Sequence, residues 1–354
     1  MEGVLKTIID IINELSKCDY SDIHIKSGEK IAIRFLGEIQ FLDYIVEYSD
    51  IISFLEKVNL DISKYKNEDL EKDFSFSYKK YRYRGNVFFS MGKISLSLRK
   101  IAHEIKSFKE LNITIEEDFL CDFSSGLVFI TGATGSGKTT SLAAIIEYIN
   151  ENSKKHIITI EDPVEYTFKN KKSIITQREV GRDTASFSSA IKSSLRQDPD
   201  IIVIGEIRDK HTMKAAINAA QTGHLCFCTL HTIGAVSTIE RILGFFSNEE
   251  KEEIRFELSM TLKAIFSQQL VKIEEKRTPI VEFLSVEKSI SNIIKEGKIN
   301  QIQNYIHINS SKGLISMDSE LLKIYYDGKI TEKTIFKICL DKEYIQKNIN
   351  KRFI

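Results

Sequence analysis

The sequence lacks the cysteine spacing of a structural metal site or of a disulfide framework. Its five cysteines are scattered and none forms a C-x-x-C pair: Cys18, Cys121, Cys226, Cys228 and Cys339. We therefore expect neither a four-cysteine zinc site nor a disulfide scaffold. Cys226 and Cys228 alternate within a strand-like run, which favours small core residues. A reducing, cytoplasmic location is the simplest interpretation.

Long apolar runs and an excess of charge are also absent. No apolar run in the 354 residues approaches the length of a membrane span, and Glu2, Lys6 and Asp10 interrupt any signal-peptide pattern. We therefore expect no direct insertion into a membrane. The 50 Lys and Arg residues balance the 50 Asp and Glu residues, which argues against a nucleic-acid binder that depends on bulk charge.

A glycine-rich turn lies between an apolar strand at 127–130 and a helix that is expected to begin near Lys138. The turn fits G-x-x-x-x-G-K-[ST] and comprises Gly132, Ala133, Thr134, Gly135, Ser136, Gly137, Lys138, Thr139 and Thr140. Glycines let successive backbone N–H groups curl round a phosphate, and the helix N-terminus adds partial positive charge. Lys138 would bring a full charge to the β- and γ-phosphates, and Thr139 would offer its hydroxyl to Mg²⁺.

Polar residues follow three apolar runs in the same half of the chain. These runs are 157–160, 201–204 and 225–230, and the polar residues after them are Glu161 with Asp162, Glu206, and His231. Because the carboxyl ends of parallel strands meet at one edge of an open α/β sheet, we expect these groups beside the phosphate loop.

Glu206 is the expected base that orients the attacking water, with Glu161 as the alternative base. Gly205 occupies the place where an Asp commonly helps to hold the metal. We therefore expect Mg²⁺ to be held by Thr139, by water and by Glu161 or Asp162. For His231, a contact with the γ-phosphate and a structural role have equal weight from the residues alone.

The first hundred residues have the pattern of a separate small α/β domain. Helices are expected at 4–16 and 51–58, and alternating apolar residues predict strands at 21–25, 31–35, 81–89 and 94–99. Arg82 and Arg84 would share one face of their strand, and periodicity alone favours a solvated charged face.

Farther along the chain, Asp183 is expected to cap a helix that carries Phe187 and Leu195. Ser247 and Glu250 form a capping-box pattern before a helix that is expected to run to about Leu270. The predicted organisation is a domain at 1–102, a linker at 103–118, a nucleotide-binding core at 119–275 and a mainly helical region at 276–354, with a loop at 310–313.

Taken together, these segments resemble the PilT-like type IV pilus retraction ATPases of the secretion ATPase superfamily. The phosphate loop matches the family's Walker A motif, 159–165 its aspartate box, 195–209 its Walker B region and 222–232 its histidine box. In that Walker B motif a glycine normally precedes the glutamate, as Gly205 does here. The resemblance covers nearly the whole chain, because 21–25 is similar to the start of the family's PAS-like domain.

The resemblance implies an α/β fold with a small PAS-like N-terminal domain, a RecA-like P-loop ATPase core and a mainly helical C-terminal part. It implies ATP and Mg²⁺, a homo-hexamer, and an inner-membrane platform protein as the partner at the cytoplasmic face of the inner or plasma membrane. Arg82, Arg84 and Arg99 lie in segments similar to those that supply the family's interdomain or intersubunit arginines. The implied catalytic residues are Lys138, Glu161, Glu206, His231, Arg82, Arg84 and Arg99.

Pilus retraction is favoured over pilus assembly or type II secretion within that superfamily. The tetracysteine motif and the long extra N-terminal region of those relatives are missing from this sequence. Residues 289–296 resemble the retraction signature A-I-R-N-L-I-R-E, with Ser291 in place of an arginine. The alternatives are an assembly or secretion ATPase, a nucleotide-binding regulatory ring with little turnover, and a nucleic-acid translocase; the balanced charge counts against the translocase.

Overall fold

The computed structural model divides into two compact units, one formed by Met1–Glu104 with Pro163–Thr167 and the other by Ile105–Asp162 with Phe168–Ile354. It describes residues 4–5, 7–15, 18, 20–35, 38–60, 71–79, 81–101, 105–113, 115, 122–273, 276–309 and 313–350. Predictions for Cys121, for 103–104, 114 and 116–118 of the linker, and for 310–312 of the loop lie outside these residues. Within the described ranges, every helix is too short or too polar to cross a membrane.

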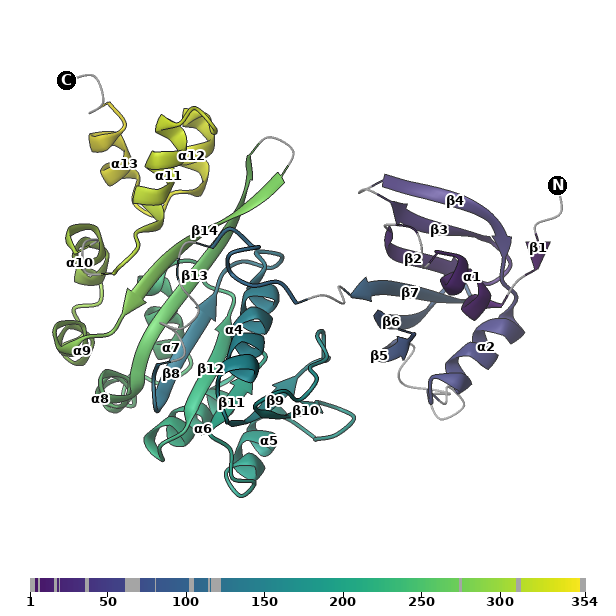
Figure 1. Ribbon diagram of the computed structural model, residues 1–354, viewed down its shortest axis with the longest axis horizontal. Helices are drawn as coiled ribbons and strands as arrows, with labels where there is room; N and C mark the ends of the chain where they lie inside the picture. The colour runs from purple at the N-terminus through teal and green to yellow at the C-terminus, as the bar shows by residue number, and fades with distance from the viewer. Residues whose placement is uncertain are drawn as a thin grey trace. The chain divides into compact units, whose positions relative to one another are not determined.

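The first unit is a seven-stranded sheet with two helices packed on one face (Figure 1). The strand order is β1-β4-β3-β2-β7-β6-β5, and all neighbours are antiparallel except β1 and β4. The elements are β1 (Val4–Leu5), α1 (Ile8–Leu15), β2 (Tyr20–Lys26), β3 (Lys30–Phe35), β4 (Glu38–Ile45), α2 (Tyr48–Lys57), β5 (Glu71–Tyr78), β6 (Tyr81–Ser90) and β7 (Lys93–Ile101).

Alternating apolar residues determine which face of this sheet is buried. Ile23 and Ile25 of β2 lie in the core with Phe54 of α2, whereas His24 points to the other face. There its Nδ1 lies 3.3 Å from the hydroxyl of Ser97.

The second unit is a seven-stranded sheet with helices on both faces (Figure 1). The order is β10-β9-β11-β12-β8-β13-β14, and only the last pair is antiparallel. Its strands are β8 (Gly126–Thr131), β9 (His156–Glu161), β10 (Ile174–Glu179), β11 (Ile201–Ile204), β12 (Leu225–Leu230), β13 (Leu262–Ile273) and β14 (Lys276–Ser285). Its helices are α4 (Lys138–Asn152), α5 (Phe187–Ser194), α6 (Lys210–Gln221), α7 (Ala235–Leu243), α8 (Lys251–Thr261), α9 (Lys288–Lys295), α10 (Gln301–Ile308), α11 (Met317–Tyr326), α12 (Glu332–Ile338) and α13 (Lys342–Asn348).

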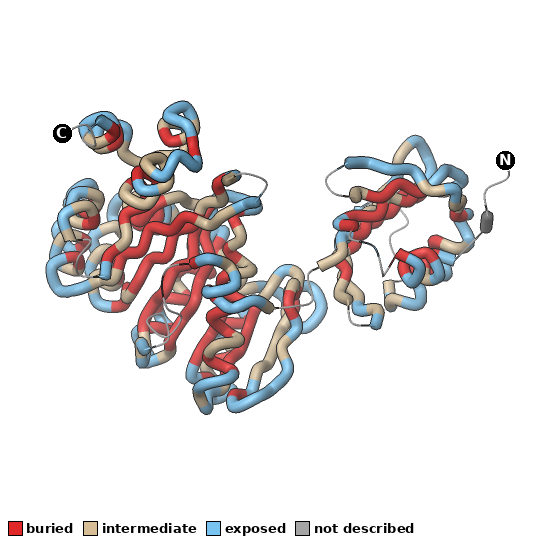
Figure 2. Tube along the Cα trace, turned by 45° about the horizontal axis from the view of Figure 1, so that its top comes forward, coloured by how far each residue is buried: buried red, intermediate tan, exposed pale blue. Residues whose placement is uncertain are grey.

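Strand β8 shows how the two faces of this sheet are filled. Leu127 and Phe129 face a core built with helices α5 to α10, and Val128 and Ile130 face α4 and the turn around Phe108. Strands β8, β11 and β12 are therefore buried along their whole length, and Figure 2 shows the buried segments at the centre of this unit. Burial on both faces explains why these strands have continuous apolar runs instead of alternating ones.

The cysteine prediction is confirmed in β12. Cys226 and Cys228 are both fully buried between neighbouring parallel strands. Burial raises the pKa of the Cys226 thiol to about 12, so it remains a neutral core group.

The predicted helix from Ser247 to about Leu270 is wrong beyond Thr261. Helix α8 ends there, and β13 begins at Leu262 between β8 and β14. Leu262, Ala264 and Ile265 are buried in that position. The helical spacing of the apolar residues in α8 continues into Leu262 and Ile265, so the pattern does not mark the point where the helix ends.

The predicted cap of α5 is also wrong. Ser186 caps this helix, because its hydroxyl accepts a hydrogen bond of 3.2 Å from the Ser189 N–H. The Asp183 carboxylate instead accepts a hydrogen bond of 2.9 Å from the Glu179 N–H. A capping side chain accepts a hydrogen bond from the N–H two or three residues later in the helix, and Ser186 makes this bond whereas Asp183 lies too far before the helix.

Candidate active site

The glycine-rich loop connects β8 to α4 through two positions that only glycine fits. Gly132 has φ 148° and Gly137 has φ 89°, both in the left-handed region. A Cβ on Gly132 would collide with the carbonyl oxygen of Gln268. A Cβ on Gly137 would lie 2.8 Å from the side-chain nitrogen of the same glutamine. The loop is thus packed closely against β13.

Within this loop, one buried polar group is suited to a phosphate oxygen. The hydroxyl of Ser136 is buried and has no hydrogen-bond partner in the described structure. Buried donors normally have partners, and an anion held at a helix N-terminus supplies acceptors in that position. The residues present therefore fit a bound phosphate chain.

Three residues predicted for the site meet at the carboxyl edge of the sheet. Lys138 Nζ donates hydrogen bonds to the carbonyl oxygens of Gly132 at 2.8 Å and Ala133 at 3.0 Å. The same nitrogen lies 3.2 Å from His231 Nδ1, and His231 Nε2 lies 3.0 Å from Glu206 Oε1. The cation of the phosphate loop, the histidine after β12 and the carboxylate after β11 therefore form one continuous chain of contacts.

The carboxylate of Glu206 is held by an arginine that the sequence did not single out. Arg208 Nη2 lies 2.7 Å from Glu206 Oε2, and Arg208 Nη1 lies 3.7 Å from Asp162 Oδ2. Burial by itself would raise the pKa of Glu206. The hydrogen bond and charge of Arg208, with His231 next, outweigh burial and hold that pKa below its usual value. Glu206 is therefore ionised at neutral pH.

Glu161 is fixed where β9 ends beside β10. Its Oε1 accepts hydrogen bonds from the Thr159 hydroxyl at 2.7 Å and from Gln177 Nε2 at 3.1 Å. In the described part of the chain, no three His, Cys, Asp or Glu residues converge as a metal cage. Hydroxyl and carboxylate oxygens at Thr139, Glu161 and Asp162 instead suit Mg²⁺, which usually keeps several waters and binds substrate phosphates.

The three predicted arginines belong to the first unit, and each has contacts there. Arg82 Nε donates to the carbonyl oxygen of Val164 at 2.7 Å, and its Nη2 donates to the Ser75 hydroxyl at 2.8 Å. Arg84 pairs with Asp73 at 3.5 Å, and Arg99 pairs with Asp22 at 2.8 Å. Their catalytic role remains a prediction.

Polar groups inside β13 and β14 support the site and were missed from the sequence. The Ser267 hydroxyl accepts a hydrogen bond of 2.7 Å from Gly234 N–H, and Glu282 Oε1 accepts one of 2.8 Å from Ala235 N–H. These bonds anchor the loop that follows His231. Burial raises the pKa of Glu282 to about 7. A glutamate within the apolar run at 280–284 was the available signal.

A cavity of about 260 Å³ lies beside the phosphate loop, next to Gly137 and Thr140. The residues that line the rest of it are Lys106, Glu110, Leu111, Asn112, Ile113, Ser141, Gln268, Leu270, Arg277 and Pro279. Apolar walls with a few polar groups are typical of small-molecule sites. None of these lining residues outside the loop was predicted from the sequence.

Comparisons with known proteins relate nearly the whole chain to one group of ATPases. The family model described as "Type II/IV secretion system protein" matches residues 1–324. The type IV pilus retraction ATPase PilT of Pseudomonas aeruginosa is 36% identical over 330 residues, which cover 92% of this chain and 96% of that protein. A twitching motility protein of Neisseria gonorrhoeae is 41% identical over 266 residues, covering 74% of this chain and 71% of that protein. The crystal structure of the pilus retraction motor PilT with bound ADP matches with a TM-score of 0.88 at 38% identity, covering 97% of this chain and 99% of that chain.

Proposed function

Because the chain belongs to the type II/IV secretion system protein family, and within it to the PilT-type ATPases, we propose that it hydrolyses ATP to retract type IV pili. The observation that carries the activity is the contact chain from Lys138 through His231 to Glu206. It joins a phosphate-binding cation to an ionised carboxylate, which are the two groups that hydrolysis of a terminal phosphate requires.

In the proposed reaction, the loop N–H groups and Lys138 bind the phosphates of ATP, and Glu206 orients the attacking water. As water adds to the γ-phosphorus, the bond from that phosphorus to the β-bridging oxygen breaks, and Glu206 receives the proton. His231 lies between Lys138 and Glu206 and contacts both. It is therefore placed to respond when the γ-phosphate leaves. Mg²⁺ would neutralise phosphate charge, held by Thr139 and by Glu161 or Asp162.

The adenine base is assigned to the cavity beside Gly137 and Thr140. The cavity adjoins the start of α4, so a nucleotide whose phosphates lie in the loop can extend into it. Leu111, Ile113 and Leu270 offer apolar surface to the faces of the ring. This placement completes a nucleotide site whose phosphate half alone was evident from the sequence.

For the assembled motor, we propose a homo-hexamer at the cytoplasmic face of the membrane that bears the pilus. Its partner there is the inner-membrane pilus platform protein. The likeness to PilT over nearly the whole of both chains supports this assembly. Arg82, Arg84 and Arg99 are proposed to add positive charge to the nucleotide site.

The activity is tested by Glu206→Gln and Lys138→Ala, with Lys155→Ala as the control. Lys155 is a lysine of the same unit that pairs with Asp200. Loss of a general base or of a phosphate-binding charge should lower kcat by about 10²-fold or more, measured as phosphate release. Unchanged turnover in both site variants would refute the assignment, and the control should match the wild type.

Deletion of the gene from its source organism tests the biological role. Retraction predicts cells with excess pili and no twitching, and restoring the wild-type gene should recover movement whereas the Glu206→Gln form should not. Bald cells would instead identify an assembly motor. A normal phenotype with active enzyme would reject both pilus roles.

A further inference from the structure

Gln268 on β13 links the phosphate loop to the first turn of α4. Its side chain is buried, with 3% of the residue exposed. Nε2 donates a hydrogen bond of 2.7 Å to the carbonyl oxygen of Ser136, and Oε1 accepts one of 2.6 Å from the Ser141 hydroxyl. The nitrogen and the oxygen of the Gln268 side-chain amide therefore both form hydrogen bonds with the segment that comprises the phosphate loop and the first turn of α4.

The backbone and the side chain of Gln268 also pack closely against Gly132 and Gly137, the first and last glycines of the motif. Its carbonyl oxygen lies 2.2 Å from the place that a Cβ would take on Gly132, and its Nε2 lies 2.8 Å from the corresponding place on Gly137. The first and last glycines of the motif therefore pack on the same residue of a neighbouring strand.

The geometry of a peptide explains what the side-chain bond can do. In a trans peptide, the carbonyl of one residue and the N–H of the next point in opposite directions. Gln268 binds the Ser136 carbonyl from the side of β13. The N–H of Gly137 is then directed away from Gln268, where it can donate to a phosphate oxygen.

We propose that Gln268 is a positioning residue that keeps the phosphate loop in its binding geometry through Ser136 and Ser141. This role rests on the proposed function of the loop as an ATP site. It differs from the role of the residues that touch nucleotide phosphates, because Gln268 acts through the peptide between Ser136 and Gly137.

The next residue along β13 provides a matched control. Gln269 lies on the opposite face of the strand, where its Nε2 donates to the carbonyl oxygen of Ile338 at 3.1 Å and lies 3.0 Å from Met317 Sδ. Gln268→Met and Gln269→Met make the same chemical change on adjacent residues. Only the first change removes contacts with the phosphate loop.

The test measures the dissociation constants of ADP and inorganic pyrophosphate with Mg²⁺, together with KM and kcat for ATP. For Gln268→Met we expect ADP and pyrophosphate to bind about tenfold more weakly, since two buried hydrogen bonds are lost. KM should rise by a similar factor, with a smaller change in kcat. Gln269→Met should lower the unfolding temperature and leave both dissociation constants within about twofold of the wild type.

Two results would overturn the role of Gln268. One is a folded Gln268→Met protein with wild-type affinity for both ligands. The other is weaker binding of ADP with unchanged binding of pyrophosphate, which would mean that Gln268 acts on the nucleoside through the cavity that it lines.

If Gln268→Met does not fold, Ser141→Ala decides the question, because it removes the Ser141 hydroxyl and with it one bond of the pair. Weaker pyrophosphate binding by a few-fold would support the role, and an unchanged constant would reject it. Failure of the proposed function is distinguishable: the wild type would then neither bind ADP nor depend on Lys138 for turnover. In that event both proposals fall.

Discussion

Glu206 and Asp162 come from different strand ends, and the guanidinium of Arg208 lies between them. Its Nη2 is 2.7 Å from Glu206 and its Nη1 is 3.7 Å from Asp162. Because a cation next to a carboxylate favours the ionised form, Arg208 counteracts the burial that would otherwise raise the pKa of Glu206. We infer that Arg208 widens the pH range over which Glu206, the proposed base, is ionised.

The first residue-scale prediction therefore concerns Arg208→Gln. The proposed base works only when ionised, so kcat falls as the pH drops through the pKa of Glu206. Removing Arg208 raises that pKa, and the acid limb of the kcat profile should move to higher pH. A profile of kcat that begins well below the usual pKa of a glutamate and extends to neutral pH measures the shift.

An arginine elsewhere in the same unit serves as the control for that profile. Arg182 is exposed and lies 3.9 Å from Asp183, so Arg182→Gln makes the same change away from Glu206. Its acid limb should coincide with that of the wild type. An Arg208→Gln profile that is merely scaled down, without movement of its acid limb, would show that Arg208 does not govern the ionisation of Glu206.

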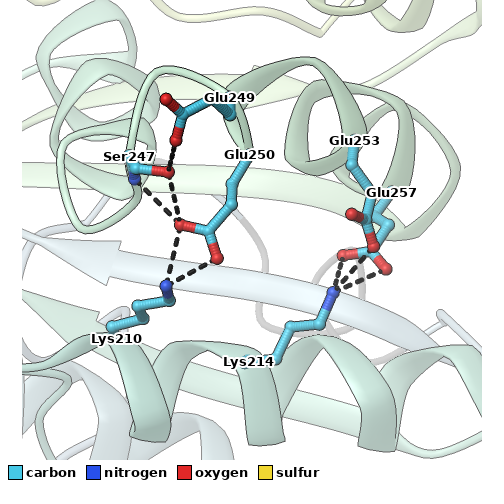
Figure 3. Close-up of polar contacts among 7 residues, drawn as sticks. All are labelled: Lys210, Lys214, Ser247, Glu249, Glu250, Glu253 and Glu257. Atoms are coloured by element: carbon cyan, nitrogen blue, oxygen red, sulfur yellow. Dashed lines mark hydrogen bonds and ion pairs between the residues drawn. The ribbon is translucent and has the colours of Figure 1, made fainter.

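At the scale of elements, α6 and α8 are joined by two groups of ion pairs, shown in Figure 3. Lys210 pairs with Glu250 at 2.5 Å, and Lys214 pairs with Glu257 at 2.9 Å and Glu253 at 3.3 Å. The Ser247 N–H donates to Glu250 at 3.0 Å, which is one half of the predicted capping box. The other half does not form, because Glu250 is itself the N-cap of α8 and the Ser247 hydroxyl donates to its carboxylate at 2.9 Å. Helix α6 follows directly after Glu206 and Arg208, so these pairs help to hold the helix that follows β11.

Replacing Lys214 should lower the free energy of unfolding more than replacing Lys210. The Glu257 side chain is 12% exposed, whereas that of Glu250 is 36% exposed. Lys214→Met would leave a largely buried carboxylate without its main partner, at a cost of roughly 1–3 kcal/mol in the free energy of unfolding. Lys210→Met should cost less, because water can solvate Glu250 and already screens that pair.

Urea unfolding of both variants at low and high salt tests this difference. Added salt should reduce the deficit of Lys210→Met more than that of Lys214→Met, since buried charges are less screened. Equal losses for the two variants, with equal salt dependence, would mean that the burial of Glu257 does not matter to its pairing.

Strand β13 marks the limit of what could be predicted about the elements. The motif from β8 to α4 was predictable, because its glycines and lysine occur at fixed spacing next to an apolar run. For β13, the apolar positions of α8 continue without interruption into Leu262 and Ile265, so a helical period extends past the true boundary. Predicting a helix there placed Gln268 on the wrong kind of element, which concealed its contact with the phosphate loop.

At the scale of the molecule, the sequence predicts the edge at which the site residues meet but not their contacts. The ends of parallel strands are brought together by topology, so Glu206 and His231 could be assigned to one edge. The pairing of Glu206 with Arg208 depends on side-chain rotamers, which strand periodicity does not determine. The glutamate at 282 could be noticed within its apolar run, but its contact with the Ala235 N–H joins segments far apart in sequence, so no local pattern could reveal that partner.

The final prediction follows from the number of cations in the nucleotide site. Phosphoryl transfer in P-loop ATPases commonly uses an arginine in addition to the loop lysine. The proposed hexamer allows Arg82, Arg84 or Arg99 of one copy to act on nucleotide bound by another copy. The single changes to Ala should each lower kcat, most strongly for the arginine that contacts the transferred phosphate, by roughly 10³-fold or more.

Mixing variants tests whether that arginine comes from a neighbouring copy. In a ring that contains both an arginine-to-Ala chain and a Glu206→Gln chain, a shared site can still combine an intact glutamate with an intact arginine. Such mixtures should hydrolyse ATP faster than either variant alone. If each arginine served only its own chain, every site in the mixed ring would lack one group, and no rescue could occur. Mixed rings without rescue, formed from chains that exchange freely, would therefore reject a shared site and leave these residues as pairing groups within the first unit.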